Sequence, residues 1–205
     1  MASLPDLTRT LNLTFGPAHG PLPRSWAMTD TARTPNLEHF VDHLPADTGI
    51  IFRHYDIRDR ATQARSIIRR AHRRAISVLI AGDPVLALET GADGIHLPSY
   101  QLNNLPVASR LRRPRNWITT AAVHNHRDIS IANRIETDAV LLSPVFPTVS
   151  HPGSAALGVL GFASLCRRSR CPVFALGGLA ISTVRRLKNS GAEGIAGIGL
   201  FIDTG

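Results

Sequence analysis

The sequence predicts an α/β protein that folds as a single (β/α)8 barrel with a shortened or missing final helix. Short apolar runs alternate along the chain with amphipathic helical patterns. Eight apolar runs can be counted, and eight parallel strands close a barrel. The length of 205 residues is enough for one such domain and short of two ordinary ones. An open, doubly wound sheet with fewer strands is the structural alternative.

Each expected strand is a short run of β-branched or other apolar residues, as in a parallel sheet that is buried on both faces. In chain order these runs are residues 26–29, 49–53, 77–81, 94–97, 117–123, 139–143, 173–176 and 194–199. The helical patterns between them cover residues 36–44, 62–74, 84–90, 107–112, 128–135, 161–168 and 181–189. Only six residues follow the eighth run, so the last helix is expected to be missing or very short.

Two glycines mark helix ends, because glycine accepts the left-handed turn that follows a helix. Gly91 and Gly191 each open a nearly identical phrase, Gly-Ala-Asp-Gly-Ile and Gly-Ala-Glu-Gly-Ile. Such a repetition is expected in a barrel, because each repeating unit contains the same junction between the end of a helix and the start of the next strand.

The expected domain organisation is an N-terminal extension, residues 1–25, followed by the barrel, residues 26–205. The extension contains four prolines and no apolar run of signal-peptide length. No stretch of the chain approaches the roughly 18 apolar residues that a bilayer span needs. These features predict a cytoplasmic protein without membrane contact. Cys166 and Cys171 match neither a disulfide framework nor a zinc pattern, so buried free thiols are expected.

The charge is strongly basic and almost entirely arginine. Of 23 basic residues against 15 acidic ones, only Lys188 is a lysine, and the net charge is +8. A Schiff base or a lysine-held diphosphate would therefore have to use Lys188. Most arginines fall where helical periodicity places an outer face, which favours a solvated surface over a polyanion site, so a nucleic-acid partner is not expected. The basic runs are residues 58–74, 110–115, 167–170 and 185–186.

The active site of a (β/α)8 barrel lies at the carboxyl ends of its strands. His124, after the fifth run, is the best candidate for a catalytic acid or base, because the ordinary pKa of histidine suits proton transfer near neutral pH. A hydrogen-bonded structural imidazole is the alternative. Gly177 and Gly178 after the seventh run, with Ile198 and Gly199 at the eighth, predict a phosphate site, because bare backbone can approach an anion.

Two further candidates have competing interpretations. Asp83, after the third run, could hold a divalent metal that bridges a diphosphate, or could cap the helix that begins at Pro84. His96, after a short fourth run, fits a structural imidazole better than a catalytic one.

Four segments carry recognisable motifs: Gly-Ala-Asp-Gly-Ile-His-Leu at 91–97, Ser-Pro-Val-Phe-Pro-Thr at 143–148, Ala-Leu-Gly-Gly-Leu at 175–179 and the phrase at 191–194. In order and spacing they resemble the thiamine phosphate synthase and TenI family, over about residues 26–201. The resemblance implies a barrel that binds a phosphorylated thiazole or thiamine phosphate. The synthase branch joins a thiazole phosphate to hydroxymethylpyrimidine diphosphate with Mg²⁺ and releases pyrophosphate, whereas the TenI branch isomerises the thiazole phosphate by proton transfer.

The synthase pattern of substrate-binding residues is only partly present. Of its glutamine, arginine and lysine after the second strand, only the arginine remains, as Arg53. Its threonine, any residue, threonine, lysine after the sixth strand becomes Thr148, Val149, Ser150 and His151. The resemblance thus assigns substrate or phosphate binding to Arg53, Thr148, Ser150 and His151.

The synthase metal site is also incomplete. The family's asparagine-aspartate pair after the third strand falls on Ala81 and Gly82, so the metal-binding aspartate is displaced to Asp83. The second metal aspartate becomes Gln101, and the serine two residues before the strand-5 histidine becomes Ala122. A departing diphosphate needs positive charge, and both synthase lysines are absent.

Three hypotheses follow. The favoured one is a TenI-like barrel that binds a thiazole phosphate and isomerises it with His124, or simply binds it, and that needs no cofactor. The second is a divergent thiamine phosphate synthase that uses Mg²⁺. The third is a non-catalytic regulatory or polyanion-binding barrel. A shortened last helix would leave barrel surface that a second subunit could cover, so a homo-oligomer is possible in each case.

Overall fold

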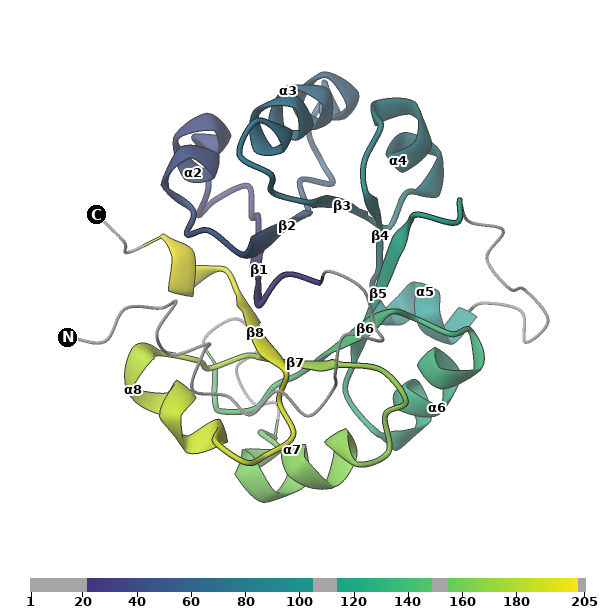
Figure 1. The fold of residues 1–205 in the computed structure, drawn as a ribbon, viewed down its shortest axis with the longest axis vertical. Helices are drawn as coiled ribbons and strands as arrows, with labels where there is room; N and C mark the ends of the chain where they lie inside the picture. Colours follow the sequence, from purple (N-terminus) through teal and green to yellow (C-terminus); the bar gives the residue numbers. More distant parts are fainter. Residues whose placement is uncertain (1–21, 105–113, 149–154, 203–205) are drawn as a thin grey trace.

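Eight parallel strands form a closed barrel in a computed structural model that describes residues 22–104, 114–148 and 155–202 (Figure 1). The strands pair in chain order, and β8 pairs with β1 to close the ring. This architecture confirms the predicted (β/α)8 barrel and excludes the open sheet. The strands are β1 (Ser25–Met28), β2 (Thr48–Phe52), β3 (Val78–Ala81), β4 (Gly94–Leu97), β5 (Ile118–Val123), β6 (Ala139–Leu142), β7 (Val173–Leu176) and β8 (Gly194–Gly197).

The helices pack around the outside of this ring, as Figure 1 shows. They are α2 (Leu37–His43), α3 (Arg60–His72), α4 (Pro84–Thr90), α5 (Ser99–Asn104), α6 (His126–Arg134), α7 (Gly158–Cys166) and α8 (Ile181–Val184), which continues as the 3-10 turn η2 (Arg185–Leu187). After β8 the described residues contain one short turn, η3 (Gly199–Phe201), which agrees with the expected stub in place of a final helix.

The helix expected at residues 107–112 lies outside the described residues. In its neighbourhood the structure has α5, which follows β4 directly and was not expected from the sequence. It begins with a turn in which the amides of Gln101 and Leu102 both donate to the Pro98 carbonyl, and it buries Leu102 completely. A six-residue helix with one buried side chain is too short to show the apolar periodicity from which a helix is predicted.

Polar side chains start several helices by accepting a backbone N–H. Asn36 caps α2 through His39 N at 3.0 Å, and Asn125 caps α6 through Asp128 N at 3.0 Å. Asp83 caps α4 through Leu86 N at 2.9 Å. These caps satisfy amides that have no partner within the helix, and they fix where each loop at the mouth of the barrel ends.

Two apolar layers hold the barrel together. The inner one fills the ring and contains Trp26, which is fully buried and meets Phe174 edge to face at 6.3 Å between ring centroids. Gly49 leaves room for this indole, since a Cβ there would collide with the Trp26 ring. The outer layer lies between the strands and the helices. With its lower part filled in this way, the ring is a packed core that supports a site only at its rim.

Cys166 and Cys171 are both buried and unbonded, which confirms the expected free thiols. Burial raises the pKa of the Cys166 thiol to about 12. Within the described residues, no helix is both long and apolar enough to cross a membrane.

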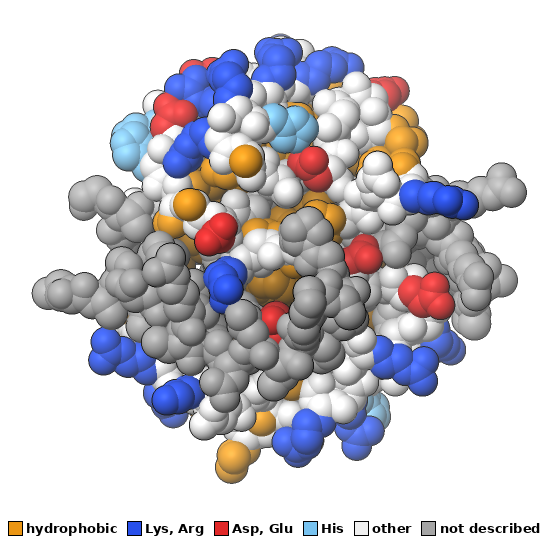
Figure 2. Space-filling view, viewed as in Figure 1, with side chains coloured by type: hydrophobic (Ala, Val, Ile, Leu, Met, Phe, Trp, Pro, Cys, Tyr) orange, Lys and Arg blue, Asp and Glu red, His pale blue; other side chains and the backbone are white. Residues whose placement is uncertain are grey.

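The basic side chains of α3 are partly paired with acidic ones. Figure 2 shows several Lys and Arg side chains gathered along the edge of the molecule where α3 lies, and others spread around the rest of the rim. Arg70 pairs with Asp42 and with Glu38 at 3.4 Å, which neutralises part of the run at residues 58–74. Arg60, in the same run, does not lie on the outer face at all: its side chain is only 16% exposed and turns toward the ends of β2 and β3.

Candidate active site

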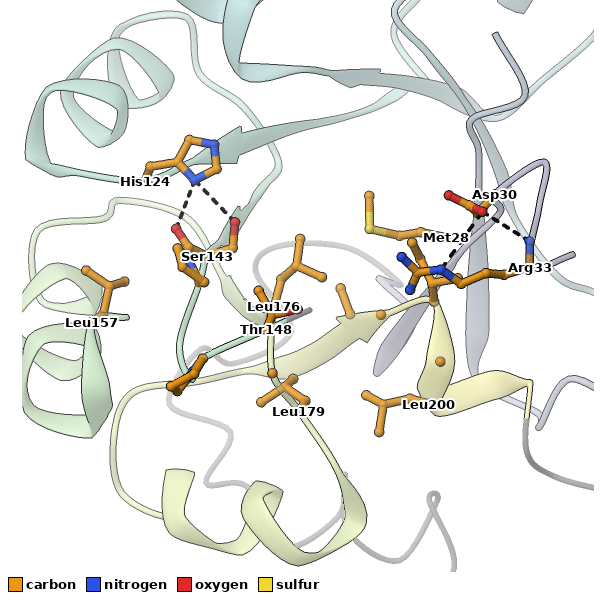
Figure 3. Close-up of a pocket in the computed structure, with 18 of the residues that line it drawn as sticks. Met28, Asp30, Arg33, His124, Ser143, Thr148, Leu157, Leu176, Leu179 and Leu200 are labelled. Carbon is orange, nitrogen blue, oxygen red and sulfur yellow. Dashed lines mark hydrogen bonds and ion pairs between the residues drawn. The ribbon is translucent and has the colours of Figure 1, made fainter. Parts of the chain in front are cut away.

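A cavity of about 960 Å³ opens at the carboxyl ends of the strands (Figure 3). Residues that follow β1, β2, β5, β6, β7 and β8 line it. Seven of the residues expected from the sequence are among them: Arg53, His124, Thr148, Gly177, Gly178, Ile198 and Gly199. Ser150 and His151 lie outside the described residues, and Asp83 does not line this cavity.

His124 follows the last residue of β5 and is held by the end of β6. Its Nδ1 lies 2.9 Å from the Ser143 carbonyl oxygen and 3.2 Å from Ser143 Oγ. A carbonyl oxygen can only accept, so Nδ1 carries the proton and Nε2 of the neutral ring has a free lone pair. The His124 amide donates to Asp128 Oδ2 at 2.8 Å, which anchors the backbone. The imidazole is exposed and oriented as a proton acceptor.

Gly177 and Gly178 let the loops after β6 and β7 touch. Both have positive φ angles, +89° and +66°. A Cβ at Gly178 would lie 2.5 Å from the Phe146 carbonyl oxygen. The loops are joined by hydrogen bonds from Val145 N to Leu176 O at 3.0 Å and from Phe146 N to Gly177 O at 3.1 Å. These glycines are therefore required by packing as well as by any anion.

Gly199 differs from that pair. It starts the η3 turn, and a Cβ built on it would meet nothing within 4 Å. The first amides of a helical turn have no acceptor within the turn. Among the described residues the amides of Gly199 and Leu200 have no backbone acceptor, and such bare backbone beside an open cavity is suited to a phosphate.

Two guanidinium groups add positive charge to the cavity. Arg53 lies at the end of β2, where its amide donates to Thr29 Oγ1 at 2.9 Å. Among the described residues no carboxylate pairs with its side chain. Arg33, whose Nε is 4.0 Å from Asp30 Oδ1, was missed by the sequence reasoning. The Asp30 carboxylate accepts the amides of Ala32 and Arg33, and this turn pattern was the available signal.

Two other histidines at the strand ends are buried. His54 Nδ1 lies 2.9 Å from Thr29 Oγ1, and His96 Nδ1 lies 2.9 Å from Thr120 Oγ1. Burial lowers the pKa of both, that of His96 to about 3, where the nearby charge of Arg53 contributes as well. Their imidazoles are neutral at pH 7 and neither lines the cavity, which agrees with a structural role for His96.

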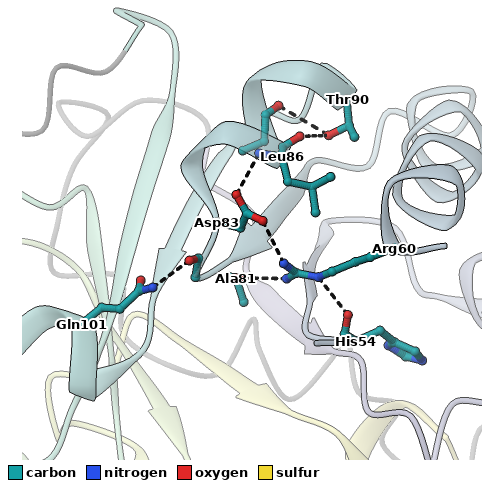
Figure 4. A network of polar contacts seen from close by, with 9 residues as sticks. His54, Arg60, Ala81, Asp83, Leu86, Thr90 and Gln101 are labelled. Carbon is teal, nitrogen blue, oxygen red and sulfur yellow. Dashed lines mark hydrogen bonds and ion pairs between the residues drawn. The ribbon is translucent and has the colours of Figure 1, made fainter. Parts of the chain in front are cut away.

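Asp83 is committed to the protein itself. Its Oδ1 accepts the Leu86 amide at 2.9 Å and its Oδ2 accepts Nη1 of Arg60 at 3.3 Å (Figure 4). The cap that the sequence offered as one alternative is therefore present. Gln101, at the position of the second metal aspartate, donates its side-chain amide to the Gly82 carbonyl at 2.7 Å.

The residues at this place do not fit Mg²⁺. Magnesium prefers carboxylate and other oxygen ligands that are free to turn toward it. Here the Asp83 carboxylate already accepts hydrogen bonds from the Leu86 amide and from the positively charged Arg60. The described part of the chain contains no group of three histidine, cysteine or acidic side chains that could hold a metal ion.

Comparison with known proteins points to one family. A family model described as thiamine monophosphate synthase matches residues 34–201. A protein of Aquifex aeolicus (strain VF5), provisionally named thiamine-phosphate synthase 2, is 30% identical over 189 residues, which cover 89% of this chain and 99% of that protein. The thiamine-phosphate synthase of Chloroflexus aurantiacus is 31% identical over 131 residues, 63% of this chain and 59% of the relative.

A solved structure agrees with this fold. Thiamine phosphate pyrophosphorylase from Pyrococcus furiosus superposes with a TM-score of 0.74, at 22% sequence identity, over 88% of this chain and 87% of that one. At this identity the likeness concerns the architecture of the barrel.

Proposed function

This chain belongs to the thiamine monophosphate synthase and TenI family of thiamine biosynthesis, and on that premise we propose that it binds a phosphorylated thiazole and isomerises it by proton transfer. One observation carries the proposal. A histidine with its Nδ1 proton tied to a backbone carbonyl opens onto the same cavity as the bare backbone after β7 and β8.

The two ends of the cavity suit the two ends of such a ligand. Figure 3 shows His124 on one side, the Asp30–Arg33 pair on the other, and the apolar side chains of Leu176 and Leu200 between them. The phosphate would lie on the amides near Gly199, with the Arg53 guanidinium as counter-charge. The heterocycle would lie against the leucines, within reach of the imidazole.

The chemistry that this arrangement supports is a tautomerisation. His124 Nε2 takes a proton from a ring carbon of the thiazole, and the double bond shifts. The imidazolium then returns a proton to another carbon of the same molecule. No group leaves and the atom count is unchanged, so neither a lysine nor a metal is needed to carry away a diphosphate. The Ser143 carbonyl stabilises the protonated ring through the Nδ1 hydrogen bond.

The test is isomerisation in deuterated water. Incubation of a thiazole phosphate with the protein is expected to give the second isomer, with deuterium at the carbon that receives the proton, as followed by NMR. Ligand binding without isomerisation or exchange would contradict the catalytic proposal and leave a binding protein. Competition by inorganic phosphate tests the phosphate site separately: phosphate should displace the thiazole phosphate if its phosphate group binds near Gly199.

A synthase is the second candidate, favoured by the names of the relatives and by the two guanidiniums at the cavity. Arginines at the mouth could bind a diphosphate in place of the missing lysines. This candidate predicts that pyrophosphate appears when hydroxymethylpyrimidine diphosphate and a thiazole phosphate are supplied with Mg²⁺. Pyrophosphate release at a rate above that of isomerisation would make synthesis the main activity.

A further inference from the structure

The ends of β2 and β3 are bridged by one guanidinium. Arg60 is the first residue of α3, and its side chain reaches back to the barrel mouth (Figure 4). Nε donates to the His54 carbonyl at 2.8 Å, Nη2 to the Ala81 carbonyl at 2.7 Å, and Nη1 to Asp83 Oδ2 at 3.3 Å. Each of the three guanidinium nitrogens thus bonds a different oxygen.

Aromatic rings complete the enclosure. The Arg60 guanidinium carbon lies 5.3 Å from the centroid of the Tyr55 ring and 5.9 Å from that of Phe52. Both distances are within the range of a cation–π interaction. With 16% of its side chain exposed, Arg60 is held as a fixed charge and has little freedom to swing into solvent.

The carbonyl and carboxylate oxygens that lie around Arg60 and Gly82 already accept hydrogen bonds. The carbonyls of His54 and Ala81 and one Asp83 oxygen accept from Arg60. The other Asp83 oxygen accepts from Leu86, and the Gly82 carbonyl accepts from Gln101. A second cation would have to displace these donors and approach the positive charge of Arg60, which repels it.

We propose that Arg60 is a built-in cation that takes the place of the divalent metal at the β2–β3 edge of this barrel. Its guanidinium joins the same kind of oxygen ligands that a metal would join, and it holds Asp83 and the two strand ends in place without an exchangeable ion. Arg60 is therefore a positioning residue. The proposal concerns this edge only and does not depend on the reaction that the neighbouring cavity performs.

The first test uses the unmodified protein and Mn²⁺ as the probe, followed by electron paramagnetic resonance. We expect wild type and Asp83→Asn to leave the same amount of Mn²⁺ free. Asn keeps an oxygen that can cap α4, so this variant removes the charge and not the cap. Binding of one Mn²⁺ by wild type that Asp83→Asn abolishes would overturn the proposal.

The second test removes the guanidinium. Arg60→Ala frees three converging oxygens, and we expect its Tm to fall by about 10 °C, because three hydrogen bonds of a guanidinium that is only 16% exposed are lost. Millimolar Mg²⁺ should restore part of this loss in Arg60→Ala and none in the double variant that also carries Asp83→Asn. Arg60→Lys keeps a positive charge and should show no response to Mg²⁺.

Arg70→Ala is the matched control. Arg70 is also on α3, and its substitution removes ion pairs with Asp42 and Glu38 that lie away from the mouth of the barrel. Mg²⁺ should restore nothing there. A folded Arg60→Ala whose Tm ignores Mg²⁺ would show that Arg60 is only a tether and refute the built-in cation. If Arg60→Ala does not fold, the Mn²⁺ measurement on wild type decides alone, since it needs no change at Arg60.

Discussion

The carboxyl ends of β1 and β5 to β8 surround a cavity, which Arg53 at the end of β2 also lines, whereas Arg60 and its hydrogen bonds fill the edge between β2 and β3. The histidines differ in the same way. His124 is exposed on the open side, while His54 and His96 are buried and neutral on the filled side. The comparison teaches that polar residues at strand ends have two separate uses in this barrel: some face an open cavity, and others bond to groups of the protein itself.

The strongest way to break this comparison is to remove the histidine of the open side. His124→Gln is expected to lower the isomerisation rate by about 100-fold or more, because proton transfer by a positioned group contributes that much. Ligand affinity, measured by calorimetry, should stay within about threefold. His126→Gln, an exposed histidine two residues along the chain, is the control. A loss of less than about tenfold for His124→Gln would remove it from the mechanism.

The glycines of the open side should separate packing from binding. Gly178→Ala forces a side chain onto a positive φ and against the Phe146 carbonyl, so we expect the free energy of unfolding to fall by about 3 kcal/mol. Gly199→Ala, with open space around its Cβ, should change it by less than about 0.5 kcal/mol and still weaken phosphate-ligand binding about tenfold. Urea unfolding and calorimetry measure the two quantities. Unchanged ligand affinity in Gly199→Ala would show that the phosphate group does not bind at Gly199.

The buried histidine on the filled side should make the free energy of unfolding depend on pH. The pKa of His96 is about 3 in the folded protein against 6.5 for an ordinary histidine. Between these values the unfolded chain binds the extra proton, so acid favours unfolding and stability is lost as the pH falls below 6.5. His96→Asn should remove up to about 1.4 kcal/mol per pH unit of this slope. Urea unfolding across that range checks it. A slope that is unchanged in His96→Asn would contradict its assignment to the buried imidazole of His96.

The smallest expected effect concerns the arginine between the two sides. Arg53→Gln should weaken binding of a phosphorylated ligand about tenfold and reduce the salt dependence of that binding, because one charge–charge contact is lost. Arg65→Gln, an exposed arginine on α3 outside the cavity, should change neither. Equal effects of the two substitutions in calorimetry would mean that only the overall charge matters.

The sequence predicted the fold well because strand and helix periodicities are local properties. Every strand was placed within two residues of its observed bounds, since each apolar run is short and ends in glycine or polar residues. Turn chemistry offered the cap by Asp83 as one of two interpretations, because Asp83 precedes Pro84 in a pattern that starts helices, whereas the caps by Asn36 and Asn125 were not predicted.

The site was predictable only in part. His124 and the glycines are found by their position after a strand, and the barrel topology brings such residues together. Arg60 was not singled out from the basic run at residues 58–74, because it lies before the expected helix and its partners, Ala81 and Asp83, lie 21 and 23 residues along the chain. Arg33 was missed because it reaches the cavity from a turn beyond the end of β1.

The bond from His124 to the Ser143 carbonyl has a consequence for how this barrel tolerates mutation. Many histidines are oriented by a carboxylate or hydroxyl, which one codon change can delete. Here the acceptor is main chain, and every amino acid at position 143 supplies it. The backbone at the end of β6 thus sets the tautomer of the imidazole. Side chains around the cavity can therefore be substituted without changing which ring nitrogen of His124 accepts a proton.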